Sequence, residues 1–158
     1  MISFVRIDDR LIHGQVVIGW TRTKSINFIL AVDDEAATNK MQVKLMKMAT
    51  PPGVKSEVLS ANDAVKLLQS GKLDKAKVFL VTKNPSALIS MATQGIELPS
   101  EINVGNVREK DGLKILPYVL VKQENIPTWK EFAKMVKMSA QLLPDQPKYN
   151  VNDIVKGM

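Results

Sequence analysis

The sequence contains no cysteine, which excludes disulfides, thiolate metal sites and a cysteine nucleophile. It has no run of about 18 apolar residues, so we expect no membrane-spanning segment. The opening residues, MISFVRIDDR, lack a basic stretch followed by an apolar run, and we therefore expect no signal peptide. Aromatic residues make up only 5% of the chain, few for stacking nucleic-acid bases. These absences favour a cytoplasmic protein and leave nucleic-acid binding a minor alternative.

We expect one domain over residues 1–158. A chain of this length is long enough to form a hydrophobic core, since it buries roughly two thirds of its unfolded surface. The formal net charge is +6, and the lysines are spread along the chain. Such a balance suits an acidic protein partner or a phosphorylated group. The sequence has a single histidine, His13, so any imidazole chemistry must occur there. A multi-histidine zinc site is excluded, and we expect no metal.

Short apolar β-rich runs alternate with segments of helical period along the whole chain. This alternation predicts an α/β fold: a mostly parallel central sheet of about seven strands with helices on both faces. We expect strands at residues 2–7, 27–32, 54–59, 78–82, 101–104, 114–121 and 140–143. We expect helices at residues 15–23, 34–49, 61–69, 85–94 and 126–138, and one or two helical turns within 150–156. Pro117 marks the 114–121 strand as an edge strand or a bulge.

The expected helix at 34–49 carries two stripes. The spacing of Met41, Leu45 and Met48 predicts an apolar face in the core, with lysines 40, 44 and 47 on a solvated face. Trp129 and Phe132 are likewise expected in the core of the helix at 126–138. For Trp20 we favour a core position over an interface.

Functional groups of such a sheet gather at the carboxyl ends of its strands. That rule places residues 7–15, 32–35, 82–85 and 104–108 on one rim. His13 falls within the first of these segments.

The segment from Arg6 to His13 contains two carboxylates, two guanidinium groups and the imidazole. At the start of the helix that follows, the free amides of Gly14, Gln15 and Val16 form an anion site. Arg10 adds a planar donor fork that suits phosphate. The sequence thus predicts phosphate binding in this loop.

A neutral imidazole next to amides and an arginine is suited to phosphoryl transfer, with His13 as the nucleophile. Either Asp8 or Asp9 can hold the orientation of the ring. The plainer interpretation is a structural histidine beside a loop whose Arg-Asp-Asp-Arg charges pair with one another.

The string RIDDRLIHGQV closely resembles the histidine loop of the enzyme IIB component of the mannose/sorbose family of the bacterial phosphoenolpyruvate-dependent sugar phosphotransferase system. The resemblance spans nearly the whole chain. It extends to Trp20, to VDDE at 32–35, to ATPPGV at 49–54, to KNP at 83–85, to NVGN at 103–106, and to Leu143-Pro144 with Pro147.

This resemblance implies that His13 accepts a phosphoryl group from a phosphohistidine of the IIA protein. His13 then passes the group to a sugar held by the membrane subunits IIC and IID. It implies phosphorylation on the ring nitrogen nearer the backbone, with Arg10 steadying the phosphoryl group and Gly14 and Gln15 in an amide cradle. It also implies a cytoplasmic protein without metal or organic cofactor, held at the membrane only through its partners.

Two segments depart from the family pattern. Many members have an arginine at the position of Gln42, where glutamine can still donate a hydrogen bond to phosphate but brings no charge. Residues 111–118 also differ, which affects the expected contacts of that segment.

Two other classes of function stay open from the residues alone. One is a phosphate- or nucleotide-binding α/β module without covalent phosphorylation, although neither a G-x-G-x-x-G nor a Walker pattern is present. The other is a basic nucleic-acid-binding domain, which predicts affinity that falls steeply with salt.

Overall fold

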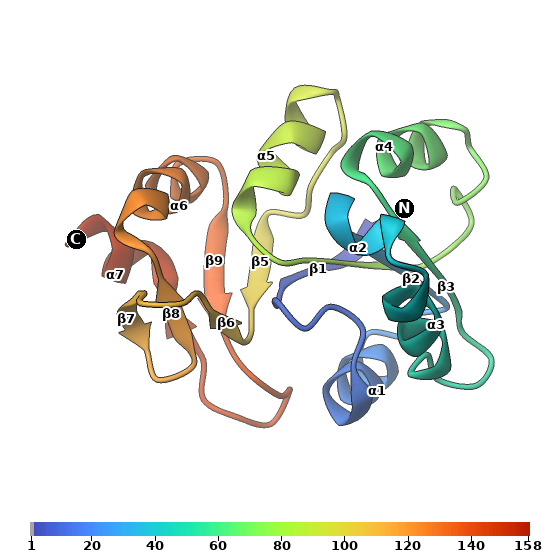
Figure 1. The fold of residues 1–158 in the computed structure, drawn as a ribbon, viewed down its shortest axis with the longest axis horizontal. Helices are drawn as coiled ribbons and strands as arrows, with labels where there is room; N and C mark the ends of the chain where they lie inside the picture. The colour runs from blue at the N-terminus through green and yellow to red at the C-terminus, as the bar shows by residue number, and fades with distance from the viewer. Residues whose placement is uncertain (1) are drawn as a thin grey trace.

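The computed structural model describes residues 2–158 and has a seven-stranded central sheet between two layers of helices (Figure 1). The strand order is β10-β9-β5-β1-β4-β2-β3, parallel throughout except for β10 against β9. The strands are β1 (Ile2–Ile7), β2 (Phe28–Val32), β3 (Lys55–Leu59), β4 (Val78–Thr82), β5 (Glu101–Val104), β9 (Lys137–Ala140) and β10 (Tyr149–Asn150). The predicted α/β fold class is therefore confirmed.

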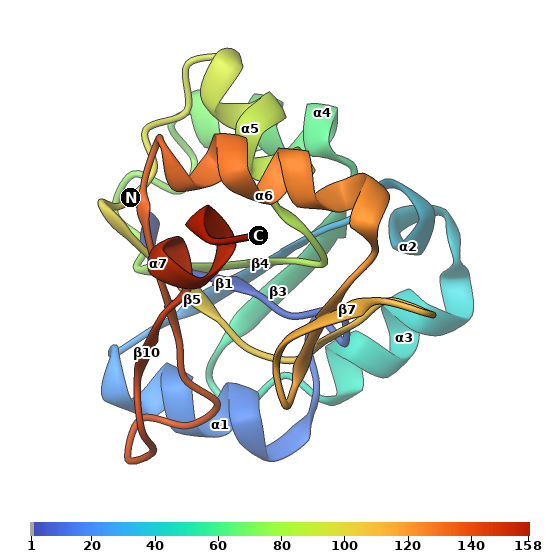
Figure 2. The same ribbon diagram turned by 90° about the vertical axis from the view of Figure 1, so that its left-hand side faces the viewer.

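Helices cover both faces of this sheet, and Figure 2 shows α1 on one side with α5 and α6 on the other. The helices are α1 (Gly14–Thr23), α2 (Asp34–Thr38), α3 (Lys40–Met48), α4 (Ala61–Gln69), α5 (Pro85–Thr93), α6 (Ile126–Ala133) and α7 (Val151–Lys156), with a 3-10 turn at Gln123–Asn125. No helix within residues 2–158 combines the length and the apolar character needed to cross a membrane.

The two faces hold two separate cores. Val5 and Ile7 of β1 pack into a core with α4, α5, α6 and α7, whereas Phe4 packs on the opposite face with α1 and α3. All five residues of β4 are buried, as expected for a central parallel strand covered on both sides. Trp129, Phe132 and Trp20 are buried, so those core predictions are confirmed.

The prediction of one continuous helix at 34–49 is wrong, because Asn39 divides the segment into α2 and α3. Asn39 has an extended backbone, and its side chain accepts a hydrogen bond from the Gln42 amide, so it caps the start of α3. The rotation of α3 also differs from the prediction. Met46 is its buried residue, and Met41, Leu45 and Met48 are exposed.

The predictions for the C-terminal third are wrong in detail. The expected strand at 114–121 is an antiparallel hairpin of β7 (Leu113–Leu116) and β8 (Val119–Val121), with Pro117 in the turn. With β6 (Val107–Arg108), it forms a separate three-stranded sheet.

The expected helix at 126–138 ends at Ala133, and the last parallel strand begins at Lys137 instead of residue 140. The side chain of Asn152 explains this boundary. Its amide donates to the carbonyls of Ala133 and Val136, and its oxygen accepts from the Met138 amide. A residue of α7 thus fixes the change from helix to strand.

Candidate functional site

The histidine loop joins the carboxyl end of β1 to α1, on the predicted rim. Its backbone is tied to the end of β4 and to the segment after β5, since the Asp8 amide donates to Thr82 O at 2.8 Å and the Asp9 amide to Asn106 O at 2.9 Å. Leu11 has a left-handed backbone (φ 58°), and the side chains of Leu11 and Ile12 are buried. The loop is therefore anchored by two apolar side chains immediately before His13.

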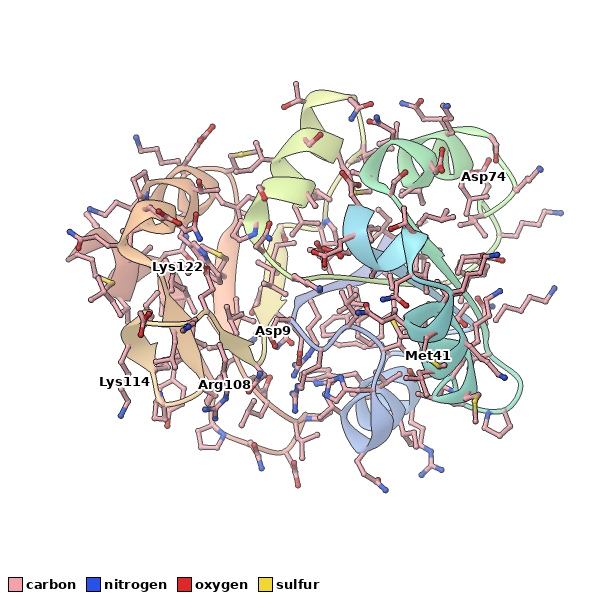
Figure 3. All side chains as sticks on the ribbon, viewed as in Figure 1. Asp9, Met41, Asp74, Arg108, Lys114 and Lys122 are labelled. Atoms are coloured by element: carbon pink, nitrogen blue, oxygen red, sulfur yellow. The ribbon has the colours of Figure 1, made fainter. Side chains whose placement is uncertain are left out.

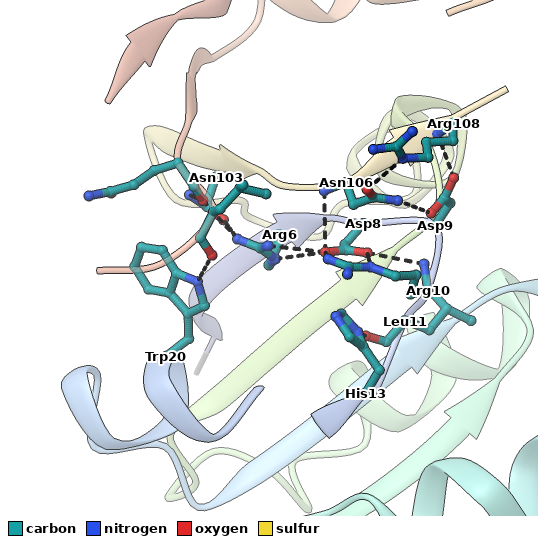
Figure 4. Close-up of polar contacts among 12 residues, drawn as sticks. Arg6, Asp8, Asp9, Arg10, Leu11, His13, Trp20, Asn103, Asn106 and Arg108 are labelled. Carbon is teal, nitrogen blue, oxygen red and sulfur yellow. Dashed lines mark hydrogen bonds and ion pairs between the residues drawn. The ribbon is translucent and has the colours of Figure 1, made fainter. Parts of the chain in front are cut away.

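Asp8 is the centre of a buried charge network beneath the loop (Figure 4). Its Oδ2 accepts from Nε of Arg6 at 3.2 Å and from Nη2 of Arg6 at 3.0 Å. Arg10 binds the same carboxylate through two nitrogens, with Nε 3.1 Å from Oδ1 and Nη2 3.0 Å from Oδ2. The amides of Arg10 and Asn106 also donate to it. Asp8 thus links two guanidinium groups of different exposure, because Arg6 is buried and the Arg10 side chain is 40% exposed.

Arg6 has further partners that hold it in place. Its Nη1 donates to Asn103 Oδ1 and to Gln141 O, and its guanidinium lies 5.8 Å from the centre of the Trp20 ring. A Cβ atom at Gly105 would overlap this guanidinium. The network therefore requires glycine at that position.

The electrostatics of this network follow from burial. Burial lowers the pKa of Arg6 because it disfavours the charged form, and the adjacent Asp8 charge opposes this shift. For Asp8, burial acts to raise the pKa, but the hydrogen bonds from Arg10 and the charge of Arg6 outweigh it and hold the pKa below its usual value. Asp8 is thus a carboxylate at neutral pH. Removal of one partner from a buried pair of this kind costs about 3–5 kcal/mol.

Asp9 ties the loop to the segment after β5. It accepts from Asn106 Nδ2 at 3.0 Å and from the Arg108 amide at 2.6 Å. We expected either Asp8 or Asp9 to orient His13, but the structure engages both carboxylates elsewhere, Asp8 with the two arginines and Asp9 with this segment.

The backbone carbonyl of Leu11 orients the His13 ring instead, at 3.1 Å from Nδ1. A carbonyl oxygen only accepts, so Nδ1 carries the proton of the neutral ring and Nε2 carries the lone pair. Among the described residues, Nε2 has no hydrogen-bond partner, and it is shielded from solvent. Burial lowers the pKa of His13, and the charges of Arg10 and Arg6 act in the same direction, while Asp8 and Leu11 oppose them.

His13 lines a pocket of about 480 Å³ between the loop and α3. The pocket brings together five residues singled out from the sequence: Asp9, Arg10, His13, Gly14 and Gln42. Asp8 lies beneath it, and Gln15 and Val16 lie in the first turn of α1. Figure 3 labels Asp9 on the loop after β1 and Met41 on α3.

The first turn of α1 supplies the predicted amides. His13 is the N-cap residue and makes no side-chain capping bond, and the first bond of the helix runs from the Val17 amide to His13 O. The amides of Gly14, Gln15 and Val16 precede that bond and point out of the helix end. Gly14 has φ +29° and open space around its Cβ position, so an approaching anion meets no side chain there.

Lys83 is a pocket residue that our reasoning from the sequence missed. It follows β4 on the same rim, and its Nζ lies 3.5 Å from Asp33 Oδ2. The signal was present, because residues 82–85 were already placed on the rim. Within residues 2–158, no cluster of three or more histidine, aspartate or glutamate side chains has the arrangement of a metal site.

Comparisons with known proteins agree with this geometry. The family model for the PTS system sorbose subfamily IIB component matches residues 2–158. The chain is 29% identical over 163 residues to a probable phosphotransferase enzyme IIB component of Streptococcus pyogenes serotype M6, covering 98% of this chain and 99% of that protein. It is 30% identical over 154 residues to the sorbose-specific EIIB component of Klebsiella pneumoniae, covering 96% and 93%.

Two further similarities concern structure and domain organisation. The crystal structure of the IIBSor domain of the sorbose permease from Klebsiella pneumoniae superposes with a TM-score of 0.93 at 28% identity, covering 100% of this chain and 98% of that one. The mannose-specific EIIAB component of Escherichia coli is 28% identical over 157 residues. That match covers 98% of this chain but only 48% of the relative.

The Gly105→Ala substitution is expected to lower the free energy of unfolding by about 1–3 kcal/mol, because the new methyl group must displace the buried Arg6 guanidinium. Urea unfolding measures this change. Gly19→Ala is the matched control, since a Cβ there meets Pro144 and Leu143 at ordinary distances of 3.7 and 3.8 Å. Equal stabilities for Gly105→Ala and the unmodified chain would contradict the packing described.

The pKa of His13 is expected to lie below its ordinary value of about 6.5, so that the ring stays neutral, and nucleophilic, into mildly acid solution. Because His13 is the only histidine, its imidazole C2 proton can be followed by NMR titration without assignment by mutation. Arg10→Ala removes a charge that lowers this pKa and should move the midpoint upward. Arg22→Ala, in the last turn of α1, should leave the midpoint unchanged. A midpoint at or above 6.5 in the unmodified chain would count against a shielded ring.

Proposed function

The chain belongs to the sorbose-subfamily IIB components of the phosphotransferase system, which are sugar phosphotransferase subunits, and we propose that its phosphoryl carrier is His13. One observation carries this proposal: the only imidazole lies in a pocket beside an exposed arginine and a helix N-terminus. Nucleophile, cation and oriented amides are what phosphoryl transfer requires of a protein.

In the first step, the P–N bond of a phosphohistidine on the IIA donor breaks as a bond forms between phosphorus and a nitrogen of His13. In the second step, a hydroxyl oxygen of the sugar attacks phosphorus, the bond to His13 breaks, and the hydroxyl proton is lost. The sugar is held by the membrane subunits IIC and IID. A relative that contains both IIA and IIB supports the donor assignment, since the two act in succession. We place this chain in the cytoplasm and propose that residues 1–158 form the single domain that carries His13 in both steps.

We propose Nδ1 as the nitrogen that accepts the phosphoryl group. In the structure this nitrogen faces the Leu11 carbonyl at 3.1 Å. The ring must therefore rotate away from Leu11, with its proton moving to Nε2, before Nδ1 can attack phosphorus. The Leu11 contact holds the unphosphorylated ring, and phosphorylation replaces it.

The charge of the phosphoryl group is balanced by several groups of the pocket. Asp8 occupies Nε and Nη2 of Arg10, which leaves Nη1 of the exposed guanidinium to donate to a phosphoryl oxygen. The amides of Gly14, Gln15 and Val16 supply oriented donors at the positive end of α1. Gln42 contributes a neutral donor from α3, and Lys83 adds a second cation in the same pocket.

The test is phosphorylation from phosphoenolpyruvate through the general phosphotransferase proteins and IIA proteins of the family, followed by intact mass. We expect one added phosphoryl group that depends on IIA, is lost in acid and is absent from His13→Ala. Arg10→Lys retains a positive charge but not the two-nitrogen contact with Asp8, so the cation is less well positioned and transfer should slow by up to about 100-fold.

The possible results of this experiment separate a histidine phosphocarrier from the other classes of function. An acid-stable label, or a label retained in His13→Ala, would overturn His13 as the carrier. Saturable nucleotide binding with no covalent label would favour a phosphate-binding module. The fold of His13→Ala and Arg10→Lys is checked by circular dichroism before rates are compared.

A further inference from the structure

The α3 helix presents an apolar surface to solvent. Met41, Leu45 and Met48 are 66%, 55% and 72% exposed, and we refer to these three residues as the α3 ridge. Their spacing places them in one line along the helix, because positions i, i+4 and i+7 share a face. Met46, by contrast, is buried against the sheet. The sequence therefore encodes an amphipathic helix whose apolar stripe has no partner within the described chain.

The α3 ridge is continuous with the His13 pocket. Leu45 belongs to the ridge and also lines the pocket, together with Gln42 and Ala49 of the same helix. The ridge is thus the outer edge of the pocket wall that faces His13. Any protein that covers the pocket opening on this side contacts it.

Direct phosphoryl transfer between two histidines requires the donor protein to cover the pocket opening. The reacting atoms must come within about 3–3.5 Å of each other, and His13 lies in a recess instead of on a projecting surface. The donor must therefore insert its phosphorylated ring into the pocket, and the donor surface around that ring rests on the pocket walls. On the α3 side, that wall ends in exposed methionine and leucine.

The charges around the ridge indicate what kind of surface fits it. Lys40, Lys44 and Lys47 line a separate depression on the flank of α3, together with Met48. Lys47 makes only a long ion pair of 3.8 Å with Glu57, and both side chains are about half exposed. A complementary partner has an apolar centre and an acidic margin. Cytoplasmic loops of membrane proteins carry an excess of lysine and arginine, which disfavours the membrane subunits as the occupant.

We propose that the α3 ridge is the docking surface for the phosphorylated IIA donor, with acidic donor residues meeting Lys40, Lys44 and Lys47. This inference rests on the proposed function of His13. The ridge sets the affinity for the donor and takes no part in the chemical step.

The test compares Met41→Glu/Met48→Glu with Met135→Glu, using the IIA protein that labels the unmodified chain. Met135 is a matched exposed methionine, 47% exposed, that follows α6, across the molecule from α3 (Figure 1). We expect the double variant to lose at least tenfold in kcat/KM for phospho-IIA, through KM, because the apolar contact is lost and acidic side chains face an acidic donor. Met135→Glu should match the unmodified chain.

A small phosphoryl donor separates docking from chemistry. Phosphoramidate phosphorylates histidine without a protein surface, so its rate at His13 should be the same in the double variant and the unmodified chain. Equal slowing with phosphoramidate would mean that the substitutions disturb the pocket, and would overturn a pure docking role.

Four further results would overturn the proposal. Unchanged kinetics with phospho-IIA would show that the donor binds elsewhere, while His13 remains the carrier. Slowing confined to transfer from the phosphorylated chain to sugar, measured with vesicles containing IIC and IID, would assign the ridge to the membrane subunits. Ridge-dependent binding to protein-free anionic vesicles, with normal IIA kinetics, would assign it to lipid. Failure of every donor to label His13 would overturn the proposed function, and this inference with it.

Discussion

The arrangement of the site depends on one buried carboxylate. Asp8 is inaccessible to solvent and accepts hydrogen bonds from Arg6, which is buried, and from Arg10, which reaches the pocket. A buried charge is tolerated only when it is paired and hydrogen-bonded on most of its lone pairs. Asp8 meets this condition with two guanidinium groups and two backbone amides. The same bonds fix the exposed arginine in position, so that in the transfer we propose it needs no further ordering to meet the phosphoryl group.

Adjacent residues of the loop have different roles, which follow from their charge and burial. Asp9 joins the loop to the segment after β5, and Leu11 and Ile12 anchor it in the core. His13 then falls at the N-cap of α1 without serving as a side-chain cap. Its ring is consequently held by one contact, to the Leu11 carbonyl, and that contact lies within the loop itself. A rigid frame with a single weakly held ring suits a group that must face a donor and then an acceptor.

Much of the fold could be predicted from the sequence, because the parallel strands are covered on both faces and appear as continuous apolar runs such as 78–82. The rim that carries His13 followed from strand direction alone. The roles of Asp8 and Asp9 could not be predicted, because both depend on residues distant in the chain. Asp8 pairs with Arg6, which is held by Asn103 and Gln141, 97 and 135 residues further on. Asp9 binds Asn106 and Arg108. The end of α6 was missed for a similar reason, because Asn152 determines it from α7.

The error at α3 has a different origin. Periodicity identifies an apolar stripe but not the surface that covers it. In α3 the buried residue is Met46, which lies outside the stripe of Met41, Leu45 and Met48. If α3 turned its ridge inward, it would bury three large side chains, so an exposed ridge is unfavourable for the isolated chain. A carrier, however, has to bind its donor, release it and bind an acceptor. Methionine is flexible and polarisable, and it makes adaptable contacts. Lysines beside such contacts favour rapid, salt-sensitive encounter over long residence. An exposed apolar ridge flanked by cations beside a recessed histidine is thus what brief and repeated docking requires, at a moderate cost in the stability of the free protein.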